Sequence, residues 1–337
     1  MESLDLRVLA DVLAWTRAGL GVTLVTVVET WGSAPRPPGA LLAVRSDGVV
    51  SGSVSGGCVE DDLIARIKAG NFDEAGTGKP SMIAYGVTRL EAARVGIPCG
   101  GSLRLVQEPV VQTAWIEQIL KRTEAHELVA RHLYLASGAV TVRAAARGDS
   151  FIFNGTDLTS LFGPKWRLLL IGAGQLSQAV ASMAVMLDFE VLVCDPREEY
   201  AAALQVTGAT RLNGMPDDVV RALQADAHTA IVALTHDPKL DDMALLEALR
   251  SDAFYVGALG SQRNTATRKA RLKVHFELTD SELSRLHGPV GLRIGAKTPA
   301  EIAVSIIAQI LQVKNAVRAS GLHAGAVNAP AKLAHAC

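Results

Sequence analysis

The stretch LLLIGAGQLSQAV, residues 168–180, decides the fold of the C-terminal half of this chain. Its apolar residues predict a buried strand, and the spacing Gly172-x-Gly174-x-x-Ser177 predicts a tight turn into a helix. The first glycine permits the turn, and the second lets a phosphate approach the backbone at the N–H groups of the helix N-terminus. Asp195 closes the next strand, at roughly the offset of 20 residues where an acid meets a ribose hydroxyl. The stretch therefore predicts a Rossmann-like fold with a nucleotide-type loop.

Around this loop, short apolar runs alternate with amphipathic helices from Trp166 onward. Such alternation predicts a parallel sheet that is covered by helices on both faces. We therefore expect a Rossmann-like doubly wound parallel-sheet domain over residues 166–318, whose last long helix runs from Pro299 to Val317, and a flexible tail over residues 319–337. The predicted strands are RLLLIG, EVLVCD, ATRLN, HTAIVALTH and AFYVGALG.

Two further segments are expected beside the Gly172 loop, because open α/β sheets bind ligands beyond the carboxyl ends of their strands. Thr235-His236-Asp237 follows the fourth strand, and YVGALGSQR, which includes Gly257, closes the fifth. His236 could act as an acid, a base or a phosphate donor, or could cap the next helix together with Asp237.

Other residues near these strands have plainer interpretations. Arg263 and Arg268 could meet a phosphate, but arginines in the first turns of a helix are more often solvated, and we favour that interpretation. Cys194 lies in an apolar strand and is expected to be a buried core thiol.

The N-terminal half has a different pattern. Short β-branched runs such as VTLVTVVET and SMIAYGV, separated by Gly, Pro and Asp, predict strands and turns, and helices are expected from Cys58 and over Ala114 to Arg122. We therefore expect an N-terminal α+β domain over residues 1–150. The pattern loosens over residues 151–165, which are expected to form a linker.

Two cysteines of this half lie beside glycines, Cys58 in SVSGGCVEDD and Cys99 in GIPCGGS. Glycine beside cysteine removes side-chain cover, so that the thiol can face a ligand. The loop before Cys58 is expected to be an anion-receptive turn. A helix N-terminus favours the thiolate, whereas the acids Glu60, Asp61 and Asp62 disfavour it. Soft-metal ligation or sulfur handling suits these cysteines better than acyl transfer, and burial in a core is the alternative. Arg36, in WGSAPRPPGALL, is either an anion clamp or part of a turn.

Composition excludes several function classes. The 337 residues carry a formal net charge of −1, are 49% hydrophobic, and contain no long basic run, which disfavours nucleic acid and anionic membranes as partners. No signal peptide or apolar span is evident, and we expect a cytoplasmic protein. The four cysteines lack CxxC spacing, which argues against a disulfide framework and a structural zinc site.

A series of motifs in this order resembles the XdhC/CoxI family of xanthine dehydrogenase accessory proteins. The motifs are GSAPRPPGALL, SVSGGCVEDDL, PCGGSLRL, LIGAGQLSQAVA, VCDPREEYA, ALTHDPKLDD, YVGALGSQR and GLRIGAKTPAEIAVSI. The resemblance implies a molybdenum cofactor-binding chaperone that is not an enzyme in the usual sense. Such a chaperone holds the cofactor for sulfuration by a cysteine desulfurase and inserts it into an apo molybdenum hydroxylase of the xanthine dehydrogenase type.

The resemblance also implies roles for particular residues. The cofactor's phosphate, or its dinucleotide, would suit the Gly172 loop, while its molybdenum and dithiolene end would suit Cys58 and Cys99 as metal contacts. The chain departs from the family where Gln175, Ser177 and Gln262 stand in place of His, Ala and Arg, which leaves the mononucleotide and dinucleotide forms both open. The implied cofactor-binding residues are Arg36, Gly56, Gly57, Cys58, Cys99, Gly100, Gly101, Gly172, Gly174, Gln175, Asp195, Thr235, His236 and Gly257.

Two other functions remain open at this point. Gly172, Gly174 and Asp195 alone would also suit an NAD(P)-dependent oxidoreductase. A protein scaffold whose loops merely fold is the third interpretation. The oligomeric state is left open, with a homodimer as one alternative.

Overall fold

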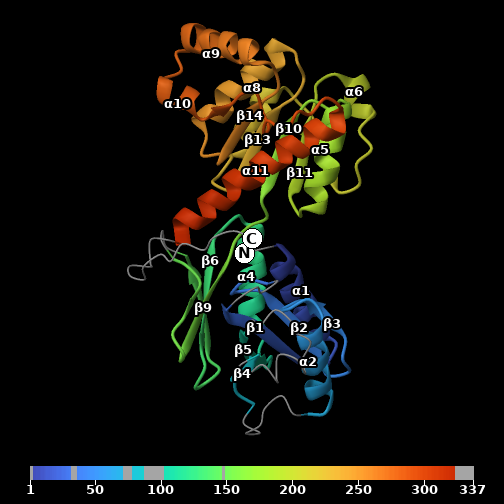
Figure 1. Ribbon diagram of the computed structural model, residues 1–337, viewed down its shortest axis with the longest axis vertical. Helices are drawn as coiled ribbons and strands as arrows, with labels where there is room; N and C mark the ends of the chain where they lie inside the picture. Colours follow the sequence, from blue (N-terminus) through green and yellow to red (C-terminus); the bar gives the residue numbers. More distant parts are fainter. Residues whose placement is uncertain (1–2, 32–35, 71–77, 87–101, 146–148, 323–337) are drawn as a thin grey trace. The chain divides into compact units, whose positions relative to one another are not determined.

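The chain folds into two compact units, which a computed structural model describes over residues 3–31, 36–70, 78–86, 102–145 and 149–322. The first unit comprises the chain up to Pro164, and the second comprises Lys165–Ser320. The first is α+β and the second is built on a parallel sheet (Figure 1), so the predicted fold classes and their order are confirmed. Among the described residues, no helix has the length and apolar character needed to cross a membrane.

The first unit is centred on a five-stranded antiparallel sheet of order β3-β2-β1-β5-β4. Alternate residues of its central strand enter two cores: Leu24 packs with helices α1 and α4, and Val25 packs with helix α2. This sheet therefore has helices on both faces. Its elements are α1 (Ser3–Arg17), β1 (Val22–Trp31), β2 (Leu41–Arg45), β3 (Val50–Gly52), α2 (Cys58–Lys68), β4 (Ser81–Tyr85), β5 (Ser102–Pro109) and α4 (Ala114–Glu124).

A second antiparallel sheet of order β7-β6-β9-β8 completes this unit. Its strands are β6 (Val129–Tyr134), β7 (Val140–Ala144), β8 (Ile152–Phe153) and β9 (Asp157–Phe162). The predicted linker over residues 151–165 is therefore wrong, because it contains two of these strands. In β9, Leu158, Ser160 and Phe162 are buried and alternate with half-buried residues, which is the period of a strand with one face on a core.

The second unit contains a six-stranded parallel sheet of order β12-β11-β10-β13-β14-β15. In chain order this is 3-2-1-4-5-6, the order of a dinucleotide-binding Rossmann fold. The order reverses between β10 and β13, where ligands of such sheets bind. The strands are β10 (Arg167–Ile171), β11 (Glu190–Cys194), β12 (Ala209–Leu212), β13 (Thr229–Ala233), β14 (Tyr255–Ala258) and β15 (Leu286–His287).

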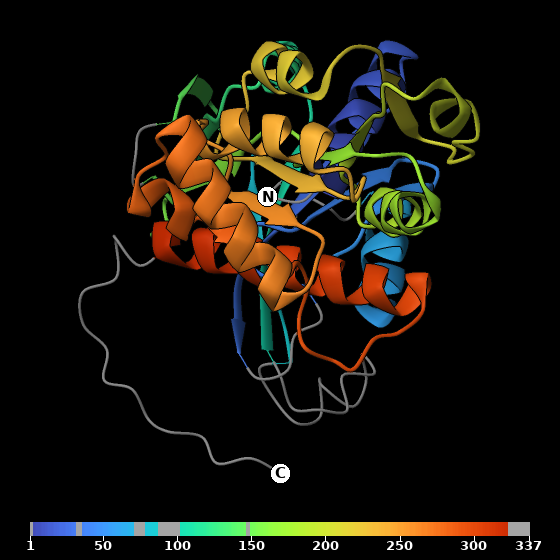
Figure 2. The same cartoon turned by 90° about the horizontal axis from the view of Figure 1, so that it is seen from above.

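Helices cover both faces of this sheet, as a doubly wound fold requires. Buried residues of α7, α8 and α9 form one core with the sheet, and those of α5 and α11 form the other. Figure 2 shows α8 and α11 (red) on opposite sides of the strands. The helices are α5 (Gln175–Met186), α6 (Glu198–Ala202), α7 (Pro216–Leu223), α8 (Pro238–Arg250), α9 (Gln262–Phe276), α10 (Asp280–Ser284) and α11 (Pro299–Leu322).

The last helix is longer than predicted. It continues beyond Val317 to Leu322, and so includes the first residues of the predicted tail, 319–322. The rest of that tail, residues 323–337, lies outside the described residues.

Candidate functional site

The Gly172 loop joins strand β10 to helix α5 at the reversal point of the sheet. Gly172 has φ +109°, and its N–H donates to the carbonyl of Cys194 at 2.8 Å. A Cβ at Gly172 would lie 3.1 Å from Cγ2 of Thr235, so glycine is needed both for the backbone angle and for the close approach. Nothing lies within 4 Å of a Cβ built on Gly174, and Gln175 is exposed. The backbone at the start of α5 is therefore open to a ligand.

The segment Thr235-His236-Asp237 follows strand β13 beside this loop. The hydroxyl of Thr235 donates to Oδ1 of Asp241 at 2.7 Å, which fixes the segment to α8. Asp237 is the N-cap of α8 and accepts the N–H of Lys239 at 2.9 Å. His236 is exposed, with φ +63° in the left-handed region. The capping role considered for His236 therefore belongs to Asp237, and the imidazole of His236 is accessible to a ligand.

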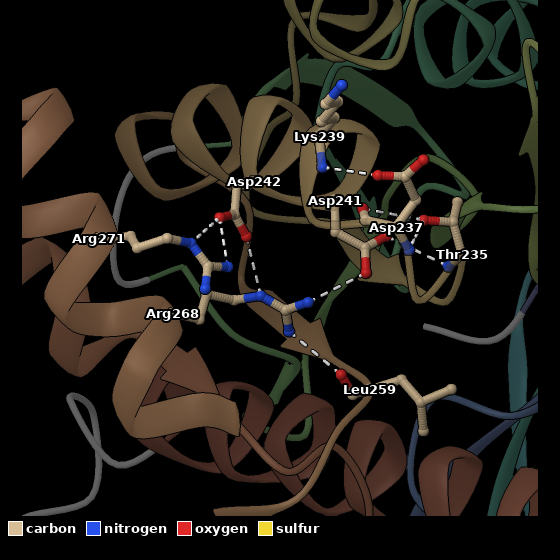
Figure 3. A network of polar contacts seen from close by, with 8 residues as sticks. All are labelled: Thr235, Asp237, Lys239, Asp241, Asp242, Leu259, Arg268 and Arg271. Carbon is tan, nitrogen blue, oxygen red and sulfur yellow. Dashed lines mark hydrogen bonds and ion pairs between the residues drawn. The ribbon is translucent and has the colours of Figure 1, made fainter. Parts of the chain in front are cut away.

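A buried ion-pair network between α8 and α9 holds this segment in place (Figure 3). Arg268, from α9, donates to Asp241 and Asp242 of α8 at 3.1 and 3.0 Å, and to the carbonyl of Leu259 at 3.1 Å. Arg271 donates twice to Asp242. Arg268 is 6% exposed, so the prediction that it is solvated is wrong: α9 turns it toward two buried carboxylates that need a cation.

Asp195 lies at the carboxyl end of β11, and its carboxylate is already bound within the protein. It accepts the N–H of Ala173 at 2.9 Å, the N–H of Arg197 at 3.0 Å, and two bonds from the Arg197 guanidinium at 2.9 and 2.8 Å. Burial alone would raise the pKa of Asp195, but these hydrogen bonds outweigh it and hold the pKa below its ordinary value. The predicted role, acceptance of a ribose hydroxyl, therefore does not match the structure, because Arg197 and the loop take its oxygens.

A pocket of about 490 Å³ adjoins Asp195 at the ends of β11 and β12. In one wall, Arg211 pairs with Glu198 at 2.6 Å. This volume is within the range of small-molecule sites, roughly 300–1,000 Å³. The pocket is lined by Asp195, Pro196, Glu198, Arg211, Asn213 and Gly214.

Gly257 and Cys194 belong to the core. A Cβ at Gly257 would lie 2.7 Å from Val290 and 2.9 Å from the ring of Tyr255, so close packing inside β14 requires glycine at this position. Cys194 is fully buried, and burial, together with the negative charge of Asp195, raises the pKa of its thiol to about 11. The interpretation of Cys194 as a core thiol agrees with this burial.

In the first unit, the glycine turn before Cys58 is filled by a carboxylate of the chain itself. The carboxylate oxygens of Glu60 accept hydrogen bonds from the N–H groups of residues 54–57 at 2.8–3.0 Å. They also accept hydrogen bonds from the hydroxyl of Ser53 and the hydroxyl of Ser55. Burial would raise the pKa of Glu60, but the hydrogen bonds from Ser55 and the two glycines that follow hold it well below its ordinary range. The turn is anion-receptive, as predicted, but its anion is Glu60.

The remaining predicted residues are placed as follows. Gly56 and Gly57 both have positive φ, +99° and +154°, and donate to Glu60. Cys58 is the first residue of α2. Arg36 is half-buried. Cys99, Gly100 and Gly101 lie outside the described residues, and within the described part of the chain no group of three or more His, Cys, Asp and Glu is arranged to hold a metal ion.

A second pocket, which the sequence did not predict, lies in the first unit and measures about 450 Å³. In its wall, Arg131 of β6 pairs with Glu108 of β5 at 2.5 Å and stacks over the ring of Trp115 at 4.0 Å. Because β5 and β6 belong to different sheets, this buried pair joins the two sheets, and we assign it a structural role. The only local signal was an arginine within the apolar run LVARHLYL.

Comparison with known proteins matches both units. A family model described as the XdhC Rossmann domain matches residues 168–310, and a model of the XdhC and CoxI family matches residues 15–86. PaoD, a molybdenum cofactor insertion chaperone from Escherichia coli K12, is 30% identical over 303 residues, which cover 88% of this chain and 85% of that protein. The chain belongs to the XdhC and CoxI family.

Other similar proteins agree with membership of the XdhC and CoxI family. A protein of Bacillus subtilis 168 described as a probable component of xanthine dehydrogenase is 28% identical, over 87% of this chain and 93% of that protein. A crystal structure of a xanthine dehydrogenase from Bacillus halodurans superposes with a TM-score of 0.73 at 23% identity and covers 94% of this chain and 96% of that one. At that identity the structure supports the fold alone.

The XdhC and CoxI family models bear differently on the predicted site residues. The Gly172 loop and Asp195 lie within the match to the Rossmann domain, and the Glu60 turn with Cys58 lies within the N-terminal match. Cys99 lies outside both matched ranges.

Proposed function

We propose that this chain is a molybdenum cofactor chaperone, which binds the cofactor, holds it for sulfuration and inserts it into an apo molybdenum hydroxylase of the xanthine dehydrogenase type. The observation that carries the proposal is the similarity to an insertion chaperone, PaoD, over 88% of this chain. Cysteine desulfurase as the sulfur donor, and a homodimer as the assembly, belong to the same proposal.

In this proposal, the second unit binds the phosphate end of the cofactor. The backbone at Gly172, Gly174 and Gln175 is open to a ligand, and helix α5 has no side-chain cap, so its first N–H groups can donate to a phosphate. The exposed His236 lies on the neighbouring loop and supplies a further donor, while Thr235 fixes that loop to α8.

The molybdenum end of the cofactor is proposed to contact Cys58 and Cys99. Thiolates are soft ligands and suit molybdenum and sulfur chemistry. Cys58 is the first residue of α2. In the turn before it, Gly56 and Gly57 meet no atom within 4 Å of a built Cβ, which leaves the approach to this helix start uncrowded.

The test is to purify the full chain anaerobically from molybdenum-replete cells and to measure bound molybdenum and pterin. We expect both in the wild type, and a loss of molybdenum in Cys58→Ala, because the substitution removes the thiolate. The matched control is Cys194→Ala, which removes a buried core thiol and is expected to keep both. A wild-type protein that carries no pterin would sink the proposal.

An NAD(P)-dependent oxidoreductase predicts a different result, namely micromolar binding of a nicotinamide nucleotide together with turnover of a hydroxy or amino acid. Occupation of the Asp195 oxygens by Arg197 and Ala173 argues against NAD, whose ribose needs a free acceptor. Titration of the same purified chain with NAD(H) and NADP(H), followed by a turnover assay, separates the two functions.

A further inference from the structure

We infer that the second unit binds a phosphate monoester at Arg197, in place of a ribose hydroxyl at Asp195, in the crevice beyond the carboxyl ends of its parallel strands. Arg197 therefore determines which ligand is accepted. The inference deepens the proposed function, and only its pterin source rests on that proposal. A phosphate monoester here has two chemical sources, the terminal phosphate of a pterin and the 2′-phosphate of a nucleotide.

The first step is that Asp195 has no acceptor site left. A carboxylate offers about four lone-pair sites on its two oxygens. Four donors occupy them: the N–H of Ala173, the N–H of Arg197, and Nε and Nη2 of Arg197. The Asp195 side chain is 0% exposed. A ribose hydroxyl could bind this acid only by displacing one of these donors.

The second step is that Arg197 keeps donors for a ligand. A guanidinium has five N–H groups, of which Asp195 takes one on Nε and one on Nη2. Among the described residues, Nη1 has no hydrogen-bond partner, and the side chain is 30% exposed. Three N–H groups therefore remain, in the planar arrangement that binds phosphate through two oxygens.

The third step is that the guanidinium is held in place before any ligand binds. Two parallel bonds to Asp195 fix its plane, and it lies 4.1 Å from the centre of the Tyr200 ring. A fixed side chain loses little conformational entropy on binding, which favours affinity. Asp195 thus acts as a positioning residue for Arg197.

The pocket beside Asp195 can hold the rest of such a ligand. Its lining includes Pro196 and Glu198, the residues on either side of Arg197 in the chain, and does not include Arg197 itself. About 490 Å³ is enough for a nucleoside or a pterin ring system. The ring would occupy this pocket while its phosphate contacts Arg197.

The test uses two pairs of probes in calorimetric titrations of the full chain. One pair is adenosine 2′,5′-bisphosphate against 5′-AMP, and the other is 6-hydroxymethylpterin phosphate against 6-hydroxymethylpterin. We expect the phosphate-bearing member of at least one pair to bind at least 10-fold more tightly. A preference in the first pair alone identifies a nucleotide as the source, and a preference in the second pair identifies a pterin.

Variants assign the preference to Arg197. Arg197→Gln is expected to abolish the preference for the phosphate-bearing probe. Arg197→Lys keeps the positive charge but is expected to lose most of this preference, because an ammonium group lacks the planar pair of donors. The matched control is Arg221→Gln in the last turn of α7, another arginine held by acids, which is expected to keep it. Circular dichroism shows whether each variant is folded.

The inference is overturned if neither pair shows a preference, or if folded Arg197→Gln retains the preference. These outcomes are independent of the cofactor content of the purified protein. A chain without bound pterin that still prefers adenosine 2′,5′-bisphosphate would therefore overturn the proposed function and support this inference.

Discussion

At the scale of single residues, Glu60 shows how an internal anion can shape a binding turn. Residues 54–57 would otherwise present several backbone N–H groups without partners, with two glycines at positive φ. The Glu60 carboxylate binds all of these N–H groups from the first turn of α2, two residues after Cys58. The Glu60 carboxylate therefore connects the start of α2, where Cys58 stands, to the turn before it.

Glu60→Gln is expected to lower the free energy of unfolding of the first unit by about 2 kcal/mol at neutral pH, because one accepting oxygen becomes an NH2 group that cannot accept and the other becomes a neutral acceptor. The folded-state pKa of Glu60 lies below its ordinary value of 4.5, so the contribution of the carboxylate is complete above that pH and is lost as the pH falls below it. Urea unfolding of wild type and variant from pH 7 to pH 3.5 measures this difference. A gap that stayed constant over this range would contradict the role of the charge.

At the scale of elements, the sequence predicted the strands of the second unit well and those of the first less well. Strands β10 and β13 are buried along their whole length and appear as continuous apolar runs. Strand β9 has only one face in the core, so Ser160 and Thr159 interrupt its apolar residues, and the pattern of the segment is that of a linker. The strands of the second unit were easier to predict because both of their faces are buried, whereas β9 buries only one face.

Helices α8 and α9 are joined by the Arg268 network, which could not be predicted from local spacing. Arg268 and Asp242 are 26 positions apart, and either residue alone would be interpreted as a solvated charge. Their side chains are only 7% and 8% exposed. Arg268 bonds the carbonyl of Leu259 after β14, and through Asp241 it is connected to Thr235 in the loop after β13. The network thus fixes two of the three segments that border the crevice.

Arg268→Met is expected to destabilise the second unit by about 3 to 5 kcal/mol at pH 7, because it leaves Asp241 as a buried carboxylate without its cation. Burial already raises the pKa of Asp241 above its ordinary value of 3.8, so protonation favours the folded state and the deficit should shrink as the pH falls toward 4. Chemical unfolding at pH 7 and pH 4.5 tests both statements. Arg263→Met, in an exposed position of the same helix, is the control and should change stability by no more than about 0.5 kcal/mol. A similar loss for both variants, or a deficit that grew on acidification, would refute this account.

At the scale of the whole molecule, the order of the two fold classes and the position of the Gly172 loop could be predicted because each depends on residues that are near in sequence. What Asp195 and Glu60 bind could not, because a carboxylate has the same sequence signature whether it meets a ligand or a neighbouring donor. In each unit a carboxylate of the chain itself accepts the backbone N–H groups at the predicted site. This carboxylate is Glu60 at the predicted anion site of the first unit and Asp195 at the predicted ribose site of the second. Free donors therefore mark the ligand sites better than the acids do, and Arg197 is such a donor.

Phosphate recognition at Arg197 belongs to the second unit only, which calorimetry of the full chain can test. Phe162→Ala first identifies the transition of the first unit, since it removes a side chain that is 1% exposed and costs about 3 to 5 kcal/mol there. A phosphate-bearing probe at 100 times its dissociation constant should then stabilise the second unit by about 2.7 kcal/mol and leave the first unchanged. The phosphate-free partner of that probe at the same concentration is the control and should produce a smaller shift. A shift confined to the transition that Phe162→Ala lowers would assign the phosphate to the first unit and contradict the role of Arg197.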